Sequence, residues 1–175
     1  MYRVRRAAGN DAVVVQNGKY RLGVSYGLDV DEFDALVERA RLLPPRGWQA
    51  AELWRRAVNL YGGDLLPEVD RDWCIVRRQE LRDKYVEALV ELGRYDEARG
   101  QVEAATERYR QALEVNQLRE DIHRRIIRTY ADAGRRSDAV TQYQRCRDIL
   151  RGELGIEPSG QTQQLYREII DQTTA

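Results

Sequence analysis

The sequence predicts an all-α fold of about seven helices, arranged as a right-handed helical repeat and preceded by a short β-hairpin. Three observations support this prediction. Residues 13–22 alternate apolar and polar side chains around Asn17-Gly18, and from residue 31 onward apolar residues recur with a period of about 3.6. In the second half of the chain, a set of small and aromatic residues also repeats after 34 positions. These patterns are typical of a two-stranded ribbon, of amphipathic helices and of stacked helix pairs.

The hairpin is predicted from the alternation on both sides of Asn17-Gly18. Both residues readily adopt the positive φ of a type I′ turn, which places Val13 opposite Leu22 and Val15 opposite Tyr20. These four side chains then share one apolar face, and the other face is mostly polar and basic. Because an isolated two-stranded hairpin is marginal in water, we expect the apolar face to pack on another part of the protein.

Seven helices are predicted after the hairpin from the apolar period and from residues that start and stop helices. Asp31 can cap the first helix, and Pro44-Pro45 ends it. Gly155 can end the sixth helix in the left-handed conformation, and Ser159 can cap the seventh. The expected helices cover about residues 32–43, 48–61, 72–99, 102–115, 119–133, 137–153 and 160–171.

The internal repeat predicts how these helices pack. Its two copies contain Gly100, Ala105, Tyr109 and Ala112, and then Gly134, Ala139, Tyr143 and Cys146. This 34-residue pattern resembles the tetratricopeptide (TPR) helix pair. Small residues let two helices approach closely, the aromatic residue fills the gap between pairs, and glycine permits the tight reversal. Ala50, Trp54 and Ala57 have the same spacing earlier in the chain, although the 55 residues from Ala50 to Ala105 indicate an insertion.

Composition argues against a free-standing nucleic-acid binder. The chain has 175 residues, 42% of them apolar, and carries 29 basic and 29 acidic residues, so its net charge is zero. The charge is uneven, because residues 1–21 carry five basic residues and one acidic residue. The basic end of the chain is therefore the hairpin end.

Metal sites, disulfides and membrane spans are not indicated. Cys74 and Cys146 have no CxxC spacing and are expected to be core thiols, and the chain has one histidine. The N-terminus lacks a signal-peptide core, and no run of 18 apolar residues occurs. We therefore expect a cytoplasmic protein with no metal and no membrane span.

Catalysis finds little support in the sequence. His123 lies next to the apolar stripe of its helix, where a packed or surface role is favoured over acid–base work. The acidic spacing of residues 27–34 suggests calcium, but the stretch lacks the glycine and terminal glutamate of an EF-hand loop and is better explained as a helix start. We expect no enzyme activity and no cofactor.

Three stretches resemble the bacterial transcriptional activator domain, the TPR-like module that follows a winged helix in SARP-type antibiotic-pathway regulators. They are residues 57–81, 112–150 and 153–169, of which the last is the most specific. The resemblance covers about residues 29–170, and Asn116-Gln117 depart from it where the family more often has Asp-Pro. It implies a regulatory module that supports dimerisation, contacts the transcription machinery or senses an upstream signal.

The first part of the chain resembles the end of an OmpR-type winged helix. The stretch "YRVRRAAGNDAVVVQNGKYRLGV" is similar to the end of a recognition helix followed by the wing. The resemblance implies that DNA is reached only through an upstream winged helix, so we expect no sequence-specific DNA binding by this chain. Alternatively, Met1 is the native start and the hairpin pads the first helix pair. Phosphate contacts in an intact protein would come from Arg3, Arg5, Arg6, Lys19 and Arg21, for which an ordinary solvated basic face is the competing explanation.

The remaining candidate for function is the helical surface. In stacked pairs the first helix of each pair lines the concave side, where TPR-type proteins usually hold a partner segment. Six arginines are candidates for an anion-binding groove, although a solvated helical face explains them equally well. They are Arg77, Arg78, Arg82, Arg124, Arg125 and Arg128. We expect a protein partner, namely a second copy, RNA polymerase or a regulatory domain; the alternative is a stand-alone TPR-like adaptor that binds a peptide or acidic segment.

Overall fold

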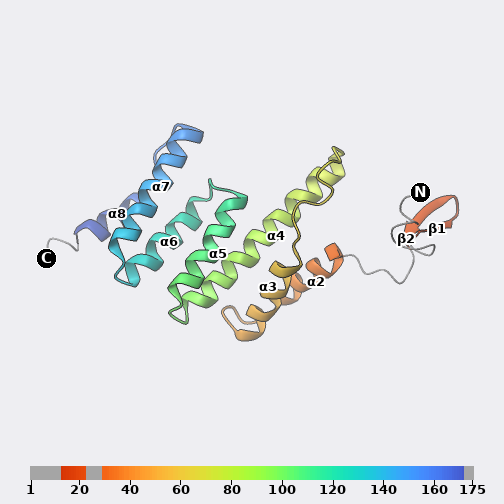
Figure 1. The fold of residues 1–175 in the computed structure, drawn as a ribbon, viewed down its shortest axis with the longest axis horizontal. Helices are drawn as coiled ribbons and strands as arrows, with labels where there is room; N and C mark the ends of the chain where they lie inside the picture. Colours follow the sequence, from red (N-terminus) through yellow and green to blue (C-terminus); the bar gives the residue numbers. More distant parts are fainter. Residues whose placement is uncertain (1–12, 23–28, 172–175) are drawn as a thin grey trace.

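The computed structural model describes residues 13–22 and 29–171, and in these ranges the chain is helical apart from one hairpin and the connecting loops (Figure 1). The strands are β1 (Val13–Gln16) and β2 (Lys19–Leu22). The helices are α2 (Asp29–Arg41), α3 (Trp48–Leu60), α4 (Asp72–Glu97), α5 (Val102–Val115), α6 (Glu120–Asp132), α7 (Arg136–Leu154) and α8 (Gly160–Asp171).

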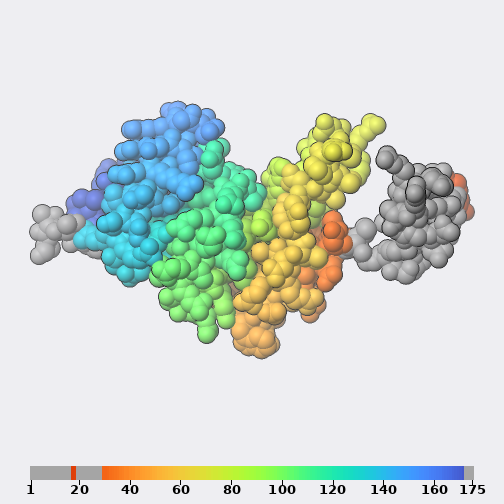
Figure 2. All heavy atoms as spheres, viewed as in Figure 1, coloured from red at the N-terminus to blue at the C-terminus, as the bar shows by residue number. Residues whose placement is uncertain are grey.

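The helices form a row in which each packs mainly on its neighbour in sequence, and α8 also contacts α6 (Figure 1). With 26 residues, α4 is the longest helix. The first turns of α4 and the loop of residues 61–71 before it project from the body in Figure 2. We call this projection the arm. This arrangement is that of a helical repeat, in which neighbouring pairs bury a continuous core.

The residues of the repeat lie in this core. Ala105, Tyr109, Ala112 and Ala139 are fully buried, as are Ala57 and Cys146, while Ala50, Trp54 and Tyr143 are exposed by 8% or less. Gly100 and Gly134 have positive φ values of 70° and 72°, which fits their place in the turns between helices. The packing that the spacing implies is therefore present at every copy of the pattern.

Two apolar clusters make up the core, and α4 contributes to both. One cluster joins α2 and α3 to α4 through residues such as Phe33, Trp54 and Leu92. The other joins α4 to the helices that follow, around Tyr109 and Ile126. Because α4 is shared, the two halves of the row are held in one continuous structure.

Gly93 marks the closest approach between α4 and α5. A Cβ atom at this position would lie 2.4 Å from Cε1 of Tyr109, so the aromatic ring rests directly on the α4 backbone. Tyr109 is fully buried. Gly93 is therefore required by packing, unlike a helical glycine that faces solvent.

The hairpin has the register derived from the sequence, with Val13 opposite Leu22 and Val15 opposite Tyr20. Asn17 and Gly18 have φ values of 53° and 72°, the positive values of a type I′ turn. In Figure 1, β1 and β2 pair with each other and lie apart from the helices. The structure describes only the backbone of these strands, so the expectation that the apolar face packs on another part of the protein stays a prediction.

The start of α2 differs from the prediction, whereas α8 begins at Gly160 as predicted, although the predicted cap Ser159 uses its side chain for another contact. Helix α2 begins at Asp29, two residues before the predicted cap Asp31, and the Asp29 carboxylate accepts a hydrogen bond from the Val30 N–H at 2.8 Å. The Ser159 hydroxyl donates to Glu120 on α6, so its side chain ties α8 to α6. The predicted end of α7 is confirmed, since Gly155 has a φ of 68° and its N–H donates to the Arg151 carbonyl at 3.1 Å.

Candidate partner-binding groove

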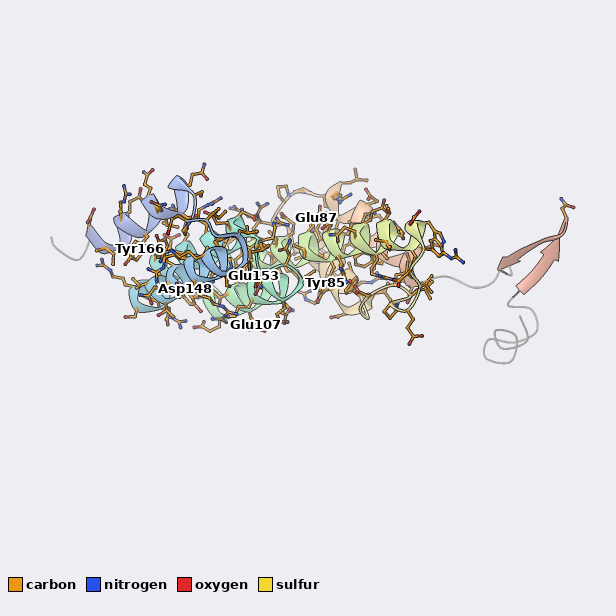
Figure 3. All side chains as sticks on the ribbon, turned by 90° about the horizontal axis from the view of Figure 1, so that it is seen from above. Tyr85, Glu87, Glu107, Asp148, Glu153 and Tyr166 are labelled. Carbon is orange, nitrogen blue, oxygen red and sulfur yellow. The ribbon has the colours of Figure 1, made fainter. Side chains whose placement is uncertain are left out.

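A groove of about 990 Å³ runs between α4 and α6 and reaches the loop between α2 and α3. In Figure 3, Glu87, which lines the groove, lies on the opposite side of α4 from Tyr85, which packs in the core. The residues that line the groove are Arg46, Asp83, Val86, Glu87, Val90, Arg94, Glu97, Gly100, Val102, Arg119, Asp121, Arg124, Arg125, Arg128, Thr129, Asp132 and Ala133. This lining is the candidate functional site.

The floor of the groove is apolar and well packed. Val86, Val90 and Val102 belong to, or pack against, the core cluster around Tyr109. Beside the floor, the Tyr109 hydroxyl and Nε of Arg94 are buried and have no hydrogen-bond partner within the described residues. Burial raises the pKa of Tyr109, so its hydroxyl stays neutral and is able only to donate or accept hydrogen bonds.

The α6 wall is basic. Arg124 donates to the Thr162 hydroxyl at 3.1 Å and lies 3.6 Å from Glu120. Arg125 lies 3.8 Å from Glu97 across the groove. Arg128 is exposed and has no ion pair in the part of the chain that the structure describes. These three arginines follow helical spacing, so the structure brings them together as the sequence predicted.

Three further arginines of the groove were not predicted from the sequence, one of which, Arg94, lies on α4. Arg46 lies in the loop before α3 with a φ of 61°, and no helical pattern places a loop residue next to α4. Arg119 precedes α6 and pairs with Asp121 at 2.8 Å. The sequence Pro-Pro-Arg-Gly predicts a turn at Arg46, but it does not predict which helix the arginine side chain lies against.

The α4 wall is mainly acidic. It contributes Asp83, Glu87 and Glu97, together with Arg94. Glu87 is held by Arg41 of α2, and Glu97 accepts a hydrogen bond from the Thr129 hydroxyl on α6. Asp121 and Asp132 also line the groove from α6, so arginines outnumber carboxylates on the α6 side and carboxylates outnumber arginines on the α4 side.

Three of the six predicted arginines lie elsewhere, which corrects the sequence analysis. Arg77 pairs with Asp34 of α2 and with Glu80. The other two bind the loop before α4, because Arg82 pairs with Asp64 and Arg78 donates to main-chain carbonyls of that loop. The carbonyl acceptors of Arg78 are those of Leu65 at 3.0 Å, Leu66 at 2.7 Å and Val69 at 3.3 Å. These side chains brace the arm, since carbonyls left unpaired in a loop are costly when partly buried.

The predicted DNA-backbone residues cannot be placed in a site. Arg3, Arg5 and Arg6 lie outside the described residues. Lys19 and Arg21 belong to β2, of which the structure describes the backbone and pairing only. Their role in DNA contact stays a prediction.

His123 has a packing role. It is 1% exposed, its Nε2 lies 3.0 Å from the Gln117 carbonyl, and its Nδ1 lies 2.7 Å from the Gln142 amide. Burial lowers the pKa of His123, so the neutral imidazole donates from Nε2 to the carbonyl and accepts at Nδ1. The ring thereby fastens the loop before α6 to α7.

Other reactive groups are likewise part of the packing. Cys74 and Cys146 are buried free thiols, and burial raises the pKa of Cys146 to about 12. Over residues 13–22 and 29–171 no group of three or more metal-binding side chains occurs. In the same ranges no helix combines the length and apolar character needed to cross a membrane.

The fold defines a class, a TPR-like helical-repeat domain, and the groove lies between two of its helices. A solved structure with this fold is that of EmbR from Mycobacterium tuberculosis in complex with a low-affinity phosphopeptide, with a TM-score of 0.67 and 24% identity over 97% of this chain and 47% of that chain. Residues 28–170 match the family model of the bacterial transcriptional activator domain. The chain belongs to this family.

Curated relatives are regulatory proteins of Streptomyces. The chain is 29% identical to the regulatory protein DnrI of Streptomyces peucetius, covering 87% of this chain and 58% of the relative. It is 25% identical to the regulatory protein AfsR of Streptomyces griseus, covering 96% of this chain but 18% of the relative. The chain thus spans between about a fifth and three fifths of these relatives.

Proposed function

We propose that the chain is the regulatory protein-interaction module of a bacterial transcriptional activator in the cytoplasm. It supports self-association, contact with the transcription machinery, or both, and its output is a docking surface rather than a reaction. The observation that carries the proposal is the α4–α6 groove, with an apolar floor and a wall of arginines, in a member of an activator family. The partner is a protein, either a second copy, RNA polymerase or a regulatory domain.

DNA contact belongs to a neighbouring part of the regulator in this proposal. Residues 1–28 are the C-terminal remnant of a winged helix, and residues 29–175 are the activator domain. The resemblance of residues 2–24 to a recognition-helix end and wing supports this division. Within an intact regulator, the basic residues of the remnant would hold DNA phosphates without reading sequence.

Two gene fusions test the proposal. In the first, the chain is joined to a DNA-binding domain that occupies its operator only as a dimer, and self-association represses a reporter. In the second, it is joined to a domain that is already dimeric, with the operator upstream of a weak promoter, and contact with RNA polymerase raises transcription. A chain that expresses well and is inactive in both fusions would overturn the proposal.

Matched variants locate the activity in the fusions. Arg128→Glu reverses a groove charge that has no ion pair in the described residues, and Arg167→Glu makes the same change at an exposed position of α8 outside the groove. We expect the first to reduce reporter activation and the second to leave it unchanged. Equal effects of the two variants would mean that reporter activation does not depend on the groove.

The alternative is a stand-alone TPR-like adaptor that binds a peptide or acidic segment. The observation in its favour is that the groove is complete within residues 46–133 and needs no second domain to form. An adaptor would bind its segment in solution and stay inactive in both fusions.

A further inference from the structure

The groove includes a stripe of residues on α4, and the same helix face continues toward the start of α4. Asp83, Val86, Val90 and Arg94 succeed one another at intervals of three or four residues, so they share one helix face. Val76 lies seven residues before Asp83 on the same face. Helix α4 has 26 residues, about 39 Å, whereas α6 has 13, about 20 Å. Helix α4 therefore extends well beyond α6 (Figure 1), and Val76 lies on the part of α4 that belongs to the arm.

The arm presents apolar side chains to solvent. Trp73 is 61% exposed and Val76 is 59% exposed, and Leu66 and Ile75 are each about half exposed. The arm is braced, because Arg78 binds three loop carbonyls and Cys74 is fully buried against the same loop. A fixed, solvent-exposed apolar surface that continues a groove is typical of a binding site.

Backbone chemistry decides between a helical and an extended occupant. The Val86–Val90 floor offers an extended segment no strand edge to pair with, so its N–H and C=O groups would depend entirely on the polar side chains of the walls. A helix satisfies these groups internally and presents apolar residues at the same three- and four-residue intervals as the α4 stripe. The groove therefore favours a helix.

Charge fixes the orientation of that helix. On the α6 wall three arginines stand beside Asp121 and Asp132, and on the α4 wall carboxylates outnumber the single Arg94. A helix whose acidic flank faces α6 meets opposite charge, whereas the reverse orientation places its carboxylates against Glu87 and Glu97.

We propose that the α4–α6 groove binds an amphipathic α-helix of a protein partner, with its apolar face on the line from Val90 to Val76 and its acidic flank against Arg124, Arg125 and Arg128. This rests on the proposed function only in that the partner is a protein. The site differs from a general peptide groove in three respects: the occupant is helical, one of its flanks is acidic, and it extends onto the arm.

The test uses the full chain and a labelled synthetic peptide of about 18 residues, about 27 Å as a helix. The peptide carries leucines at every third and fourth position and glutamates along one flank. One control peptide replaces the glutamates with lysines, and another places two prolines in its middle to prevent a helix. Binding is measured by fluorescence anisotropy at low and at physiological salt.

We expect saturable binding of the acidic helix with one peptide per chain. Arg128→Glu should weaken it by about fivefold to tenfold at low salt, since the exposed ion pair is lost and the reversed charge adds repulsion. Val76→Ser should weaken it by about fivefold through lost apolar contact on the arm. Arg167→Glu, outside the groove, should leave the affinity unchanged.

Three results would overturn the inference: equal binding of the lysine peptide, equal binding of the proline peptide, or equal effects of Arg128→Glu and Arg167→Glu. Absence of saturation up to about 1 mM peptide would do so as well. A chain that binds the acidic helix but is inactive in both fusions keeps this inference and loses the proposed regulatory role. A chain that is active in the fusions but does not bind the peptide keeps the proposed regulatory role and loses this inference.

Discussion

Replacing Gly93 by alanine tests the packing on which the fold depends. In an exposed helix this change would stabilise by about 1 kcal/mol, because alanine is the better helix former. In α4, however, the new Cβ would lie 2.4 Å, 2.6 Å and 2.9 Å from three ring carbons of Tyr109. The ring is fully buried and has no free space to enter, so the neighbouring helices must shift.

The expected magnitude follows from these two opposing effects. Overpacking a well-packed core costs about 1–3 kcal/mol, and a contact this short to an aromatic ring belongs at the upper end of that range. After subtracting the helix-propensity gain, we expect Gly93→Ala to destabilise by about 1–2 kcal/mol. For a chain of this size the melting temperature should fall by about 2–8 °C.

Gly152→Ala is the matched control. Gly152 also lies within a helix, α7, but its Cβ would have no atom within 4 Å, and the residue is exposed. We expect this variant to be as stable as the parent or more stable by up to about 1 kcal/mol. Unfolding by urea, followed by circular dichroism, measures both.

A double-mutant cycle with Tyr109→Leu isolates the contact. In the background of the smaller leucine, Gly93→Ala should cost clearly less than in the parent, because the ring that it strikes is gone. If Gly93→Ala stabilises as much as Gly152→Ala does, the close approach of α4 and α5 inferred here is wrong.

Three further predictions concern groups outside the groove. Burial lowers the pKa of His123 below its ordinary 6.5, so the unfolded state takes up the proton first as the pH falls. The free energy of unfolding should therefore decrease below pH 6.5 by up to about 1.4 kcal/mol per pH unit. The decrease should end when the pH reaches the pKa of His123 in the folded state. Urea unfolding at several pH values measures this slope, which should be smaller in His123→Gln. Glu120→Ala leaves the Ser159 and Thr162 hydroxyls without their acceptor, and should destabilise by about 1–3 kcal/mol with faster hydrogen exchange in α8; unchanged exchange there would contradict the role of this carboxylate. The chain alone should not distinguish an operator from random duplex in gel-shift assays at physiological salt, and nanomolar discrimination would refute the assignment of DNA reading to an upstream part.

The sequence predicted those features in which packing restricts the residue type. Ala105 and Tyr109 recur at fixed spacing because only a small residue allows two helices to approach and only a large ring fills the gap between pairs. The hairpin register followed in the same way from the positive φ that Asn17 and Gly18 accept. In each case the local pattern and the tertiary contact impose the same requirement.

The charged surface was predicted less well, because an arginine is compatible with many surroundings. Arg78 and Arg128 are both basic residues of a first helix in a pair, but Arg78 binds loop carbonyls and Arg128 faces the groove. The difference depends on the insertion before α4, whose path along the helix no sequence period encodes. Arg46 shows the same limit, since a turn conformation and not a repeat position brings it to the groove.

The groove and the helical packing are linked through α4. Gly93 accommodates the Tyr109 ring, and Glu97, one helical turn later on the same face of α4, lines the groove together with Arg94. A shift of α4 away from α5 would therefore move the acidic wall relative to the arginines of α6. We expect Gly93→Ala to weaken binding of the acidic helix in addition to lowering stability, whereas Tyr143→Leu, on α7 and remote from the groove, should lower stability and leave the affinity of the folded fraction unchanged. If both variants bind the peptide as the parent does, the position of the groove wall does not depend on the packing of the repeat.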